Sequence, residues 1–400
     1  MVKLSNSINR IKPSATMAVT QQARELKAQG KDIIGLGAGE PDFDTPENIK
    51  EAAIAAIKRG DTKYTAVDGT PELKSAIKDK FKRDNNLDYS LDEISVGTGG
   101  KQIIFNAFAV TLDQGDEVII PAPYWVTYPD VVNYFNAKPI FIKCSELNNF
   151  KITAEELEKS INPSTKWLIL NSPSNPTGAC YTKKELEDIA VVLERNDQVN
   201  ILTDDLYEYL IYDDVKFHTI AQVAPNLKDR VLTLNGVSKA YAMTGWRIGY
   251  AGGNKDLIKA MGKFQSQSTS NPTSISQAAA VEALNGINSF IAERNLIFKQ
   301  RRDNLLKSLN NIEGINCKTP DGAFYAFPSC KGIIGKRAKD NKTINDDEDF
   351  TSALLNHAGV AVVQGSAFGL EGYFRISYAT SDENLKNACE RLSKFCSELK

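Results

Sequence analysis

Histidine is scarce in this 400-residue chain, and its two histidines, His218 and His357, stand far apart. A metal centre built on histidine ligands is therefore not expected, and we predict no metal site. The six cysteines are scattered and form no Cys-x-x-Cys pair. This pattern predicts reduced thiols rather than a disulfide framework or a zinc site.

The chain also lacks an excess of either charge, because 48 lysines and arginines stand against 50 aspartates and glutamates. We therefore expect neither a nucleic acid nor a membrane as a partner. No apolar run approaches the length of a membrane span, and the first residues show no signal-peptide pattern. With 42% hydrophobic residues, the composition predicts a globular, cytoplasmic protein.

Short apolar runs alternate with amphipathic segments from about residue 93 onward. This alternation is typical of an α/β fold, in which helices cover both faces of a mostly parallel sheet. Strands are predicted at 94–97, 117–121, 139–143, 167–171, 200–204, 231–235 and 248–251. Helices are predicted at 18–29, 46–60, 71–84, 101–112, 124–136, 183–195 and 273–308, the last in one or two pieces. Ligands of such sheets bind at the carboxyl ends of the strands.

The pattern changes after residue 308, where predicted strands and helices no longer alternate regularly. Antiparallel strands are predicted within 315–327 and 360–378, and helices at 348–358 and 382–399. We therefore predict a large domain at 46–308, a smaller α+β domain at 309–400, and an N-terminal segment at 1–45 that joins the smaller domain.

A lysine and an arginine lie eight positions apart in the stretch LTLNGVSKAYAMTGWRIGY, residues 232–250. Lys239 stands among small residues with no acidic neighbour in sequence. A desolvated lysine near a second cation has a lowered pKa, so its neutral amine can attack an aldehyde. Arg247 offers a planar fork for a phosphate. Pyridoxal phosphate carries both groups, although a surface loop with two ordinary cations would give the same pattern.

The same stretch resembles the cofactor-attachment signature of class I aminotransferases at Gly-Val-Ser-Lys239, Ala242-Met243, Gly245 and Arg247-Ile248-Gly249. The resemblance extends from about Lys12 to Leu392 and is closest to the bacterial aspartate aminotransferases, some of which also accept prephenate. It implies the fold type I of pyridoxal-phosphate-dependent transferases, with the cofactor held by Lys239 as a Schiff base. It also implies a homodimer with active sites at the interface.

Glycines between a predicted strand and a predicted helix, in SVGTGGK at 95–101, can offer backbone N–H groups to a phosphate. The spacing is not that of a nucleotide-binding P-loop. The resemblance implies contacts to the cofactor phosphate group and its surroundings from Gly99, Gly100, Lys101, Ser238 and Arg247, and from Tyr64 of the neighbouring subunit.

Asp204 follows a predicted buried strand, where a carboxylate could bind a metal, cap a helix or pair with a protonated pyridine nitrogen. The resemblance implies the pyridine partner. It further implies that Tyr207 and Asn175 bind the ring 3-oxygen and that Trp125 stacks on the ring. The family usually has glutamate where this chain has Asp205, a difference beside the catalytic acid rather than at it.

Arg375 alternates with apolar residues in YFRISY, residues 373–378, and an arginine on an inward strand face needs an anion. A carboxylate is the best match for its two parallel donors. The resemblance implies that Arg375 binds the substrate α-carboxylate beside Gly39. Other substrate contacts that it implies come from Trp125, Asn175, Lys101, Lys12, Ser14 and Thr16. Lys12 would serve a bulkier substrate such as prephenate, or it is simply a surface lysine.

The implied reaction moves the amino group of L-aspartate to 2-oxoglutarate through the Schiff base, giving oxaloacetate and L-glutamate. Amination of prephenate to arogenate is a second reaction, and Lys239, Asp204 and Tyr207 are the expected catalytic residues. Elimination, decarboxylation or aromatic amino acid transamination on the same fold is the nearer alternative. A ligand-sensing regulator is more distant, since only about 30 largely neutral residues precede the glycine-rich segment at 36–43.

Overall fold

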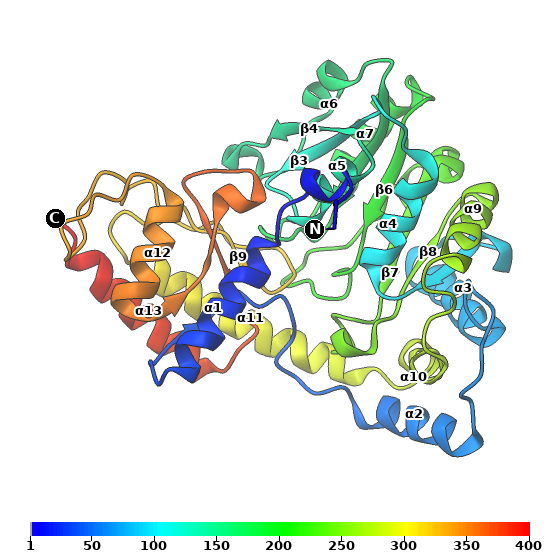
Figure 1. Cartoon of the computed structure of the whole chain (residues 1–400), viewed down its shortest axis with the longest axis horizontal. Coiled ribbons are helices and arrows are strands. Elements are labelled where there is room, and N and C mark those ends of the chain that lie inside the picture. The colour runs from blue at the N-terminus through cyan, green and yellow to red at the C-terminus, as the bar shows by residue number, and fades with distance from the viewer. Residues whose placement is uncertain (1) are drawn as a thin grey trace.

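A seven-stranded sheet forms the centre of the larger part of the molecule (Figure 1). The computed structural model describes residues 2–400. The strand order is β2-β8-β7-β6-β5-β3-β4, and β8 alone runs against its neighbours. The strands are β2 (Ile94–Gly97), β3 (Glu117–Ala122), β4 (Lys138–Lys143), β5 (Thr165–Asn171), β6 (Asn200–Asp204), β7 (Val231–Gly236) and β8 (Gly249–Gly252). Each corresponds to a predicted strand, with ends within two residues, so the predicted α/β sheet is confirmed.

The reversed direction of β8 follows from its connection to β7. Parallel neighbours need a crossover, usually a helix, whereas antiparallel neighbours can be joined by a shorter connection. Between β7 and β8 the chain forms only the 3₁₀ helix η5 (Thr244–Trp246). This connection carries both Lys239 and Arg247. It lies within the stretch at 232–250 that resembles the cofactor-attachment signature.

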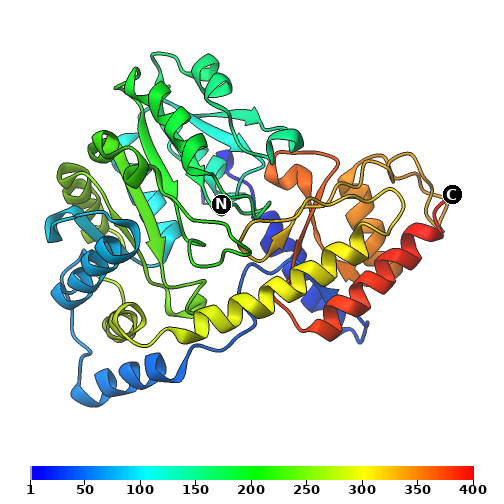
Figure 2. The ribbon, with the colours of Figure 1, turned by 180° about the vertical axis from the view of Figure 1, so that it is seen from behind.

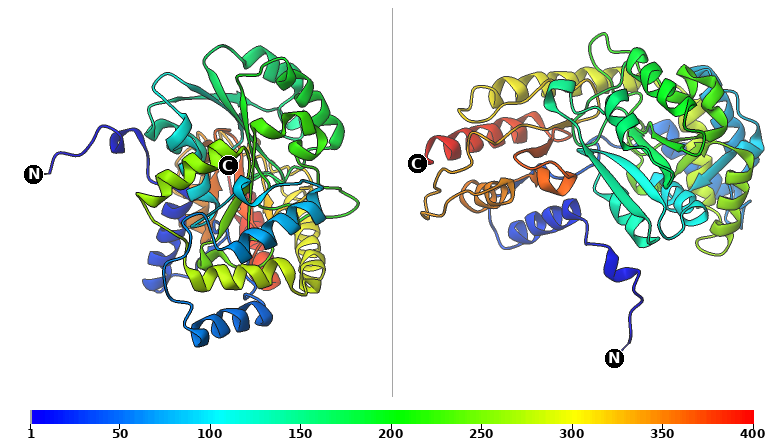
Figure 3. Two further views of the ribbon diagram at one scale, coloured as in Figure 1. Left: turned by 90° about the vertical axis from the view of Figure 1, so that its right-hand side faces the viewer. Right: turned by 90° about the horizontal axis from the view of Figure 1, so that it is seen from above.

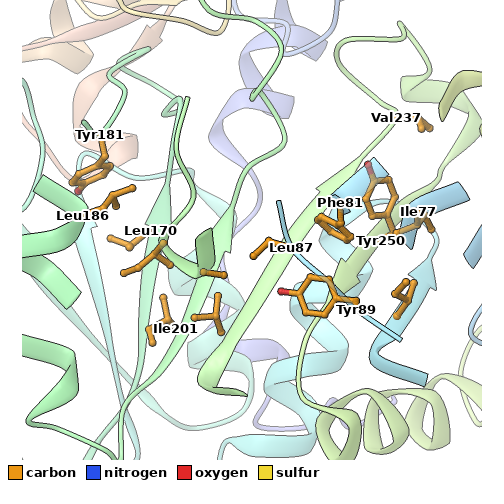
Figure 4. Close-up of a cluster of buried hydrophobic side chains, with 14 of the residues drawn as sticks. Ile77, Phe81, Leu87, Tyr89, Leu170, Tyr181, Leu186, Ile201, Val237 and Tyr250 are labelled. Carbon is orange, nitrogen blue, oxygen red and sulfur yellow. The ribbon is translucent and has the colours of Figure 1, made fainter. Parts of the chain in front are cut away.

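Helices cover both faces of the sheet, as Figure 3 shows from the side and from above. Alternate residues of β5 face opposite clusters: Leu168 and Leu170 pack with α3 and α7, and Trp167 and Ile169 pack with α4 and α5. Figure 4 shows part of the first cluster. The helices here are α2 (Glu47–Arg59), α3 (Pro71–Asn85), α4 (Gly100–Thr111), α5 (Thr127–Tyr134), α6 (Ala154–Ser160), α7 (Lys183–Glu194), α8 (Ile220–Val223), α9 (Lys255–Ser266), α10 (Ser274–Asn285) and α11 (Ser289–Leu309).

The helix predictions are confirmed for α2, α3, α4 and α7, and the region 273–308 divides into α10 and α11 at a break near Gly286. The prediction of a helix at 124–136 is too long, because α5 begins only at Thr127. The helices α6, α8 and α9 were not predicted. No described helix, from residue 2 to residue 400, is both long and apolar enough to cross a membrane.

The remaining elements form a smaller α+β part around two short sheets. β1 (Ile34–Gly35) pairs in parallel with β10 (Val360–Ala361), and a second sheet has the antiparallel order β11-β12-β9. The other elements are α1 (Ala15–Ala28), β9 (Tyr325–Ala326), α12 (Asp347–Ala358), β11 (Val363–Gln364), β12 (Phe374–Ser377) and α13 (Asp382–Ser397). Further 3₁₀ helices are η1 (Ile8–Arg10), η2 (Leu91–Glu93), η3 (Glu146–Asn148), η4 (Pro225–Arg230) and η6 (Gly365–Phe368).

The strands predicted within 315–327 and 360–378 are much shorter than expected, because turns interrupt them. The predicted helices at 18–29, 348–358 and 382–399 are confirmed as α1, α12 and α13. α11 runs from beside the sheet into the smaller part (Figure 2), and residues of α11 and α13 share one apolar cluster with Ile34 and Leu36. The domain boundaries after residues 45 and 308 stay a prediction.

Candidate active site

A cavity of about 400 Å³ lies at the carboxyl ends of β5, β6 and β7. Asn171 and Asp204 end β5 and β6, and Lys239 follows β7 by three residues. The predicted site residues that line the cavity are Ser14, Thr16, Gly39, Gly100, Lys101, Trp125, Asn175, Asp204, Tyr207, Ser238, Lys239, Arg247 and Arg375. Segments from both parts of the fold thus meet at the sheet edge where ligands of α/β proteins bind.

Lys239 is a half-buried lysine whose Nζ donates to the backbone oxygen of Gly39 at 2.5 Å. Burial, followed by the positive charge of Arg375, lowers its pKa to about 8. Glu40 and Asp204 oppose this shift, and Arg247 reinforces it. A larger fraction of the amine is therefore neutral near neutral pH than in an ordinary lysine, and the neutral amine is the form that acts as a nucleophile.

Asp204 is a buried carboxylate, 5% exposed, at the last position of β6. Tyr128 Oη donates to its Oδ2 at 2.7 Å, and the backbone N–H of Leu206 reaches its Oδ1 at 3.4 Å. Burial raises the pKa of Asp204, because it disfavours the charged form. A cationic N–H group in the cavity would restore the ionised form by pairing with this carboxylate.

Arg375 lies on β12 with its side chain buried, 1% exposed. Its Nη1 donates to Asn175 Oδ1 at 2.8 Å and its Nη2 to the Gly37 backbone oxygen at 2.6 Å, whereas Nε has no partner within residues 2–400. Burial lowers its pKa. Nearby, the hydroxyls of Tyr207 and Tyr325 share a hydrogen bond of 2.8 Å. A guanidinium without a carboxylate partner at this depth is suited to bind an anionic ligand.

The start of α4 and the β7–β8 connection pack closely against each other. Gly99 has φ +81°, and a Cβ there would lie 2.1 Å from Arg247 Nη2. A Cβ at Gly249 would lie 2.2 Å from the backbone nitrogen of Gly100. Only glycine fits at both positions, and the first turn of α4 keeps its free N–H groups beside a guanidinium. This arrangement is typical of phosphate sites.

Positive charge predominates in the cavity, where Arg24, Lys101, Lys239, Arg247 and Arg375 face only two carboxylates. Lys101 Nζ lies 5.0 Å from the centroid of the Trp125 ring. Desolvation and the charge of Arg247 lower the pKa of Lys101. A ligand with several negative charges fits this cavity.

Comparisons with known proteins agree with this chemistry. The family described as "Aminotransferase class I and II" matches residues 31–392. A protein of Rhizobium leguminosarum described as a probable aspartate/prephenate aminotransferase is 61% identical, with both chains covered completely. A Cereibacter sphaeroides protein described as an aspartate/prephenate aminotransferase is 58% identical, also over the whole of both chains. The chain belongs to the class I and II aminotransferases.

Solved structures of aminotransferases superpose closely on the chain. The aspartate aminotransferase of Rhizobium meliloti has a TM-score of 0.98 and 54% identity, with both chains fully covered. The Thermus thermophilus aspartate aminotransferase with maleate has a TM-score of 0.93 and 42% identity, covering 99% of this chain and 100% of that one. The fold of the aminotransferase is therefore fold type I, as predicted from the resemblance.

Aminotransferases of this family use pyridoxal phosphate, and the cavity fits this cofactor at three places. Lys239 offers an amine of lowered pKa to the aldehyde. Asp204 offers the pyridine nitrogen a buried carboxylate that has no ion-pair partner in the described part of the chain. The residues that would hold the phosphate are Gly99, Gly100, Lys101, Ser238 and Arg247. These roles remain proposals, as do those of Asn175, Tyr207 and Trp125 on the ring.

Three predicted residues of the aminotransferase do not line the cavity. Gly99 lies behind Arg247, where its lack of a side chain makes room for the guanidinium. Tyr64 is 91% exposed. Lys12 is exposed, and its backbone N–H donates to Asp130 at 3.2 Å. The predicted roles of Tyr64 and Lys12 thus depend on neighbours outside this single chain and stay predictions.

Several residues of the site carry little signal in the sequence. Tyr128 bonds the Asp204 carboxylate, and Tyr325 bonds Tyr207 from the smaller part of the fold. Glu40 accepts a hydrogen bond from Thr244 at the cavity wall. In the sequence, the indication for Tyr128 is its position just after two aromatic residues, Tyr124 and Trp125, at the start of a predicted helix. Nothing local in the sequence distinguishes Tyr325 from a core tyrosine.

Proposed function

We propose that this aminotransferase moves the amino group of L-aspartate to 2-oxoglutarate. The observation that carries the proposal is a pair of cationic positions in one cavity, Arg375 beside Asn175 and Lys101 over Trp125. Two cations suit the two carboxylates of aspartate. The Thermus relative, described as an aspartate aminotransferase, was crystallised with maleate, which is also a dicarboxylate.

The chemistry divides between cofactor and protein. Pyridoxal phosphate, when bound, supplies an aldehyde for the amino group and a ring that accepts electrons from the substrate α-carbon. Arg375 would orient the α-carboxylate through its guanidinium. Lys239, in its neutral form, would remove the α-proton, and Asp204 would keep a proton on the pyridine nitrogen. Tyr128, by donating to Asp204 Oδ2, holds that carboxylate in place.

Amination of prephenate is a second candidate activity. Two relatives that match over their whole length are described as aspartate/prephenate aminotransferases, one of them as probable. Ser14 Oγ and Thr16 Oγ1 lie 3.0 Å apart at the start of α1 and line the cavity. Hydroxyls and a lone lysine bind a carboxylate less selectively than an arginine fork does, which favours a broader range of acidic substrates.

We also propose that two chains form a homodimer with active sites at the interface. Tyr64 is almost fully exposed, although the resemblance assigns it to a neighbouring cofactor phosphate. The segment before α1 extends from the body of the molecule (Figure 3), and it exposes Val2 and Leu4. Exposed apolar side chains on an extended arm suit a contact with a second copy. A cytoplasmic location is part of the same proposal.

The visible spectrum of the purified enzyme tests the proposed reaction. A band of bound cofactor should bleach with aspartate and return with 2-oxoglutarate, because each half-reaction converts one form of the enzyme into the other. Ammonia or carbon dioxide released without stoichiometric bleaching would indicate elimination or decarboxylation instead. A prephenate assay with glutamate as donor tests the second activity.

Lys101→Ala distinguishes side-chain recognition from general damage to the site. We expect kcat/KM for aspartate to fall about tenfold more than kcat/KM for alanine, since only aspartate carries the distal carboxylate. Equal losses for the two donors would remove Lys101 from substrate recognition.

A further inference from the structure

Four buried polar residues form a cluster outside the cavity, which we call the Glu208 cluster. Lys80 is 0% exposed, Asn85 and Asn235 are 2% exposed, and Glu208 is 4% exposed. None of them lines the cavity. Burying a charged pair is a weak source of stability, because the loss of hydration offsets the attraction. The cluster therefore needs an explanation beyond stability.

Every member of the cluster contacts the Glu208 carboxylate. Asn85 Nδ2 donates to Oε2 at 2.7 Å, and Asn235 Nδ2 donates to Oε1 at 2.8 Å. Lys80 Nζ pairs with Oε1 and also donates to Asn85 Oδ1 at 2.6 Å. The charge of Glu208 is thus neutralised by Lys80, and its two oxygens bind two residues of α3, Lys80 and Asn85, and one residue of β7, Asn235.

The cluster joins the two segments that carry the proposed catalytic groups. Glu208 follows Tyr207 directly and Asp204 by four residues, and Asn235 precedes Lys239 by four residues. The register between β6 and β7 ends at the pair Asp204 and Leu234. The bond from Asn235 to Glu208 therefore continues the connection between the two strands beyond the end of their ladder.

The surroundings of the cluster favour rigid geometry. Lys80 Nζ lies 5.2 Å from the centroid of the Phe81 ring and 5.4 Å from that of Tyr209. Phe81 packs with Tyr250 and Ile77 in the apolar cluster of Figure 4. Hydrogen bonds to a charged group are stronger where water is excluded, so the carboxylate holds both neighbours firmly.

We propose that the Glu208 cluster is a positioning device for the cofactor site. It fixes the distance between the segment with Asp204 and Tyr207 and the segment with Lys239. Asn235 is its decisive member, since it alone connects the Glu208 carboxylate to the strand that leads to the lysine. This inference rests on the proposed roles of Asp204 and Lys239.

A matched pair of variants tests the positioning role of the Glu208 cluster. Asn235→Ala and Asn85→Ala each delete one amide that donates to Glu208, and each opens a similar buried space. Only Asn235→Ala breaks the connection to β7. The measurements are the dissociation constant for pyridoxal phosphate, by titration of the cofactor-free protein, the Tm of that protein, and kcat and KM for aspartate.

We expect both variants to lower the Tm by similar amounts. Asn235→Ala should also raise the dissociation constant and lower kcat, each about tenfold, with KM changed by no more than about twofold. Asn85→Ala should keep the dissociation constant and kcat within about twofold of the unchanged protein. Should Asn235→Ala fail to fold, Asn235→Ser removes the same bond with a smaller cavity and the same expected losses.

Equal effects of the two variants on cofactor affinity and kcat, or no effect of either, would overturn the proposal and leave the cluster a structural one. The affinity comparison needs no particular substrate. It therefore decides the role of the Glu208 cluster even if the unchanged enzyme fails to transaminate aspartate. That failure would overturn the proposed function instead.

Discussion

Replacing Arg375 by methionine should impair catalysis while leaving the protein folded. Its guanidinium is 1% exposed, and its Nε has no partner among the described residues. The hydrogen bonds to Asn175 and Gly37 each contribute about 1.5–3 kcal/mol, whereas burying a cation without a counter-ion costs several kcal/mol. Because the two terms are similar, we expect the free energy of unfolding to change by less than about 2 kcal/mol.

The effect of Arg375→Met on the reaction should be much larger. A guanidinium fork on the substrate α-carboxylate makes two charge-assisted hydrogen bonds, worth about 1.5–3 kcal/mol each. Losing roughly 3–6 kcal/mol of transition-state binding lowers kcat/KM by about 10²–10⁴-fold. The rate at which aspartate bleaches the cofactor band measures this loss, and thermal unfolding of the cofactor-free protein measures the change in stability.

Arg302→Met is the matched control. Arg302 is also buried, 2% exposed, but it pairs with Asp213 at 2.9 Å and with Asp303 at 2.7 Å. Its replacement removes one cation from two carboxylates that Lys299 still pairs with, and it leaves the Pro320 carbonyl oxygen without its donor. We therefore expect it to destabilise the protein by about 1–3 kcal/mol with kcat/KM unchanged. The reasoning on Arg375 is refuted if Arg375→Met destabilises the protein by more than about 2 kcal/mol, or if it leaves kcat/KM for aspartate as the control does.

Other predictions concern the cofactor residues. Lys239→Ala should abolish the adduct between protein and cofactor that borohydride reduces, and peptide mapping that still finds the adduct in this segment would contradict the assignment. Burial lowers the pKa of Lys239 from 10.5 to about 8, so the folded cofactor-free protein binds fewer protons than the unfolded chain between these values. Its free energy of unfolding should therefore rise with pH across this interval. In denaturant titrations repeated at several pH values, the free energy of unfolding of Lys239→Met should rise less with pH. Gly99→Ala should weaken binding of pyridoxal phosphate by about tenfold, because its Cβ would displace Arg247. Gly60→Ala is the control at another glycine of positive φ, +78°, where the added Cβ meets nothing, and it should leave cofactor affinity unchanged.

Most of the central sheet could be predicted because strands such as β2, β5, β6, β7 and β8 are buried on both faces. Leu168 and Leu170 face one apolar layer and Trp167 and Ile169 face the other, so β5 reads as a continuous apolar run. Such runs are short and clearly bounded, which explains why the predicted strand ends are nearly correct. The cavity could be anticipated for a related reason, since polar motifs that follow parallel strands necessarily meet at one edge of the sheet.

The contacts that complete the site could not be predicted in the same way. Tyr128 stands 76 residues before Asp204, and Tyr325 stands 118 residues after Tyr207. Which core tyrosine turns its hydroxyl toward a carboxylate depends on how the helices and the smaller part of the fold pack, and no local pattern records that. The regions of the short strands β9 to β12 were predicted, but their bounds were not, because turns rather than apolar periodicity set their ends.

The cations of this protein fall into two groups, and the difference points to the ligand. Buried cations away from the cavity have carboxylate partners: Lys80 pairs with Glu208, and Arg302 pairs with Asp213. Arg375 and Lys239, in the cavity, have no ion-pair partner among the described residues, although lack of a partner at such depth costs free energy. A fold that pairs its other buried cations leaves these two free for groups that arrive with the substrate and the cofactor. Pyridoxal phosphate would bring the group that reacts with Lys239, and it binds the folded protein. The unfolding temperature should therefore rise with cofactor concentration by mass action.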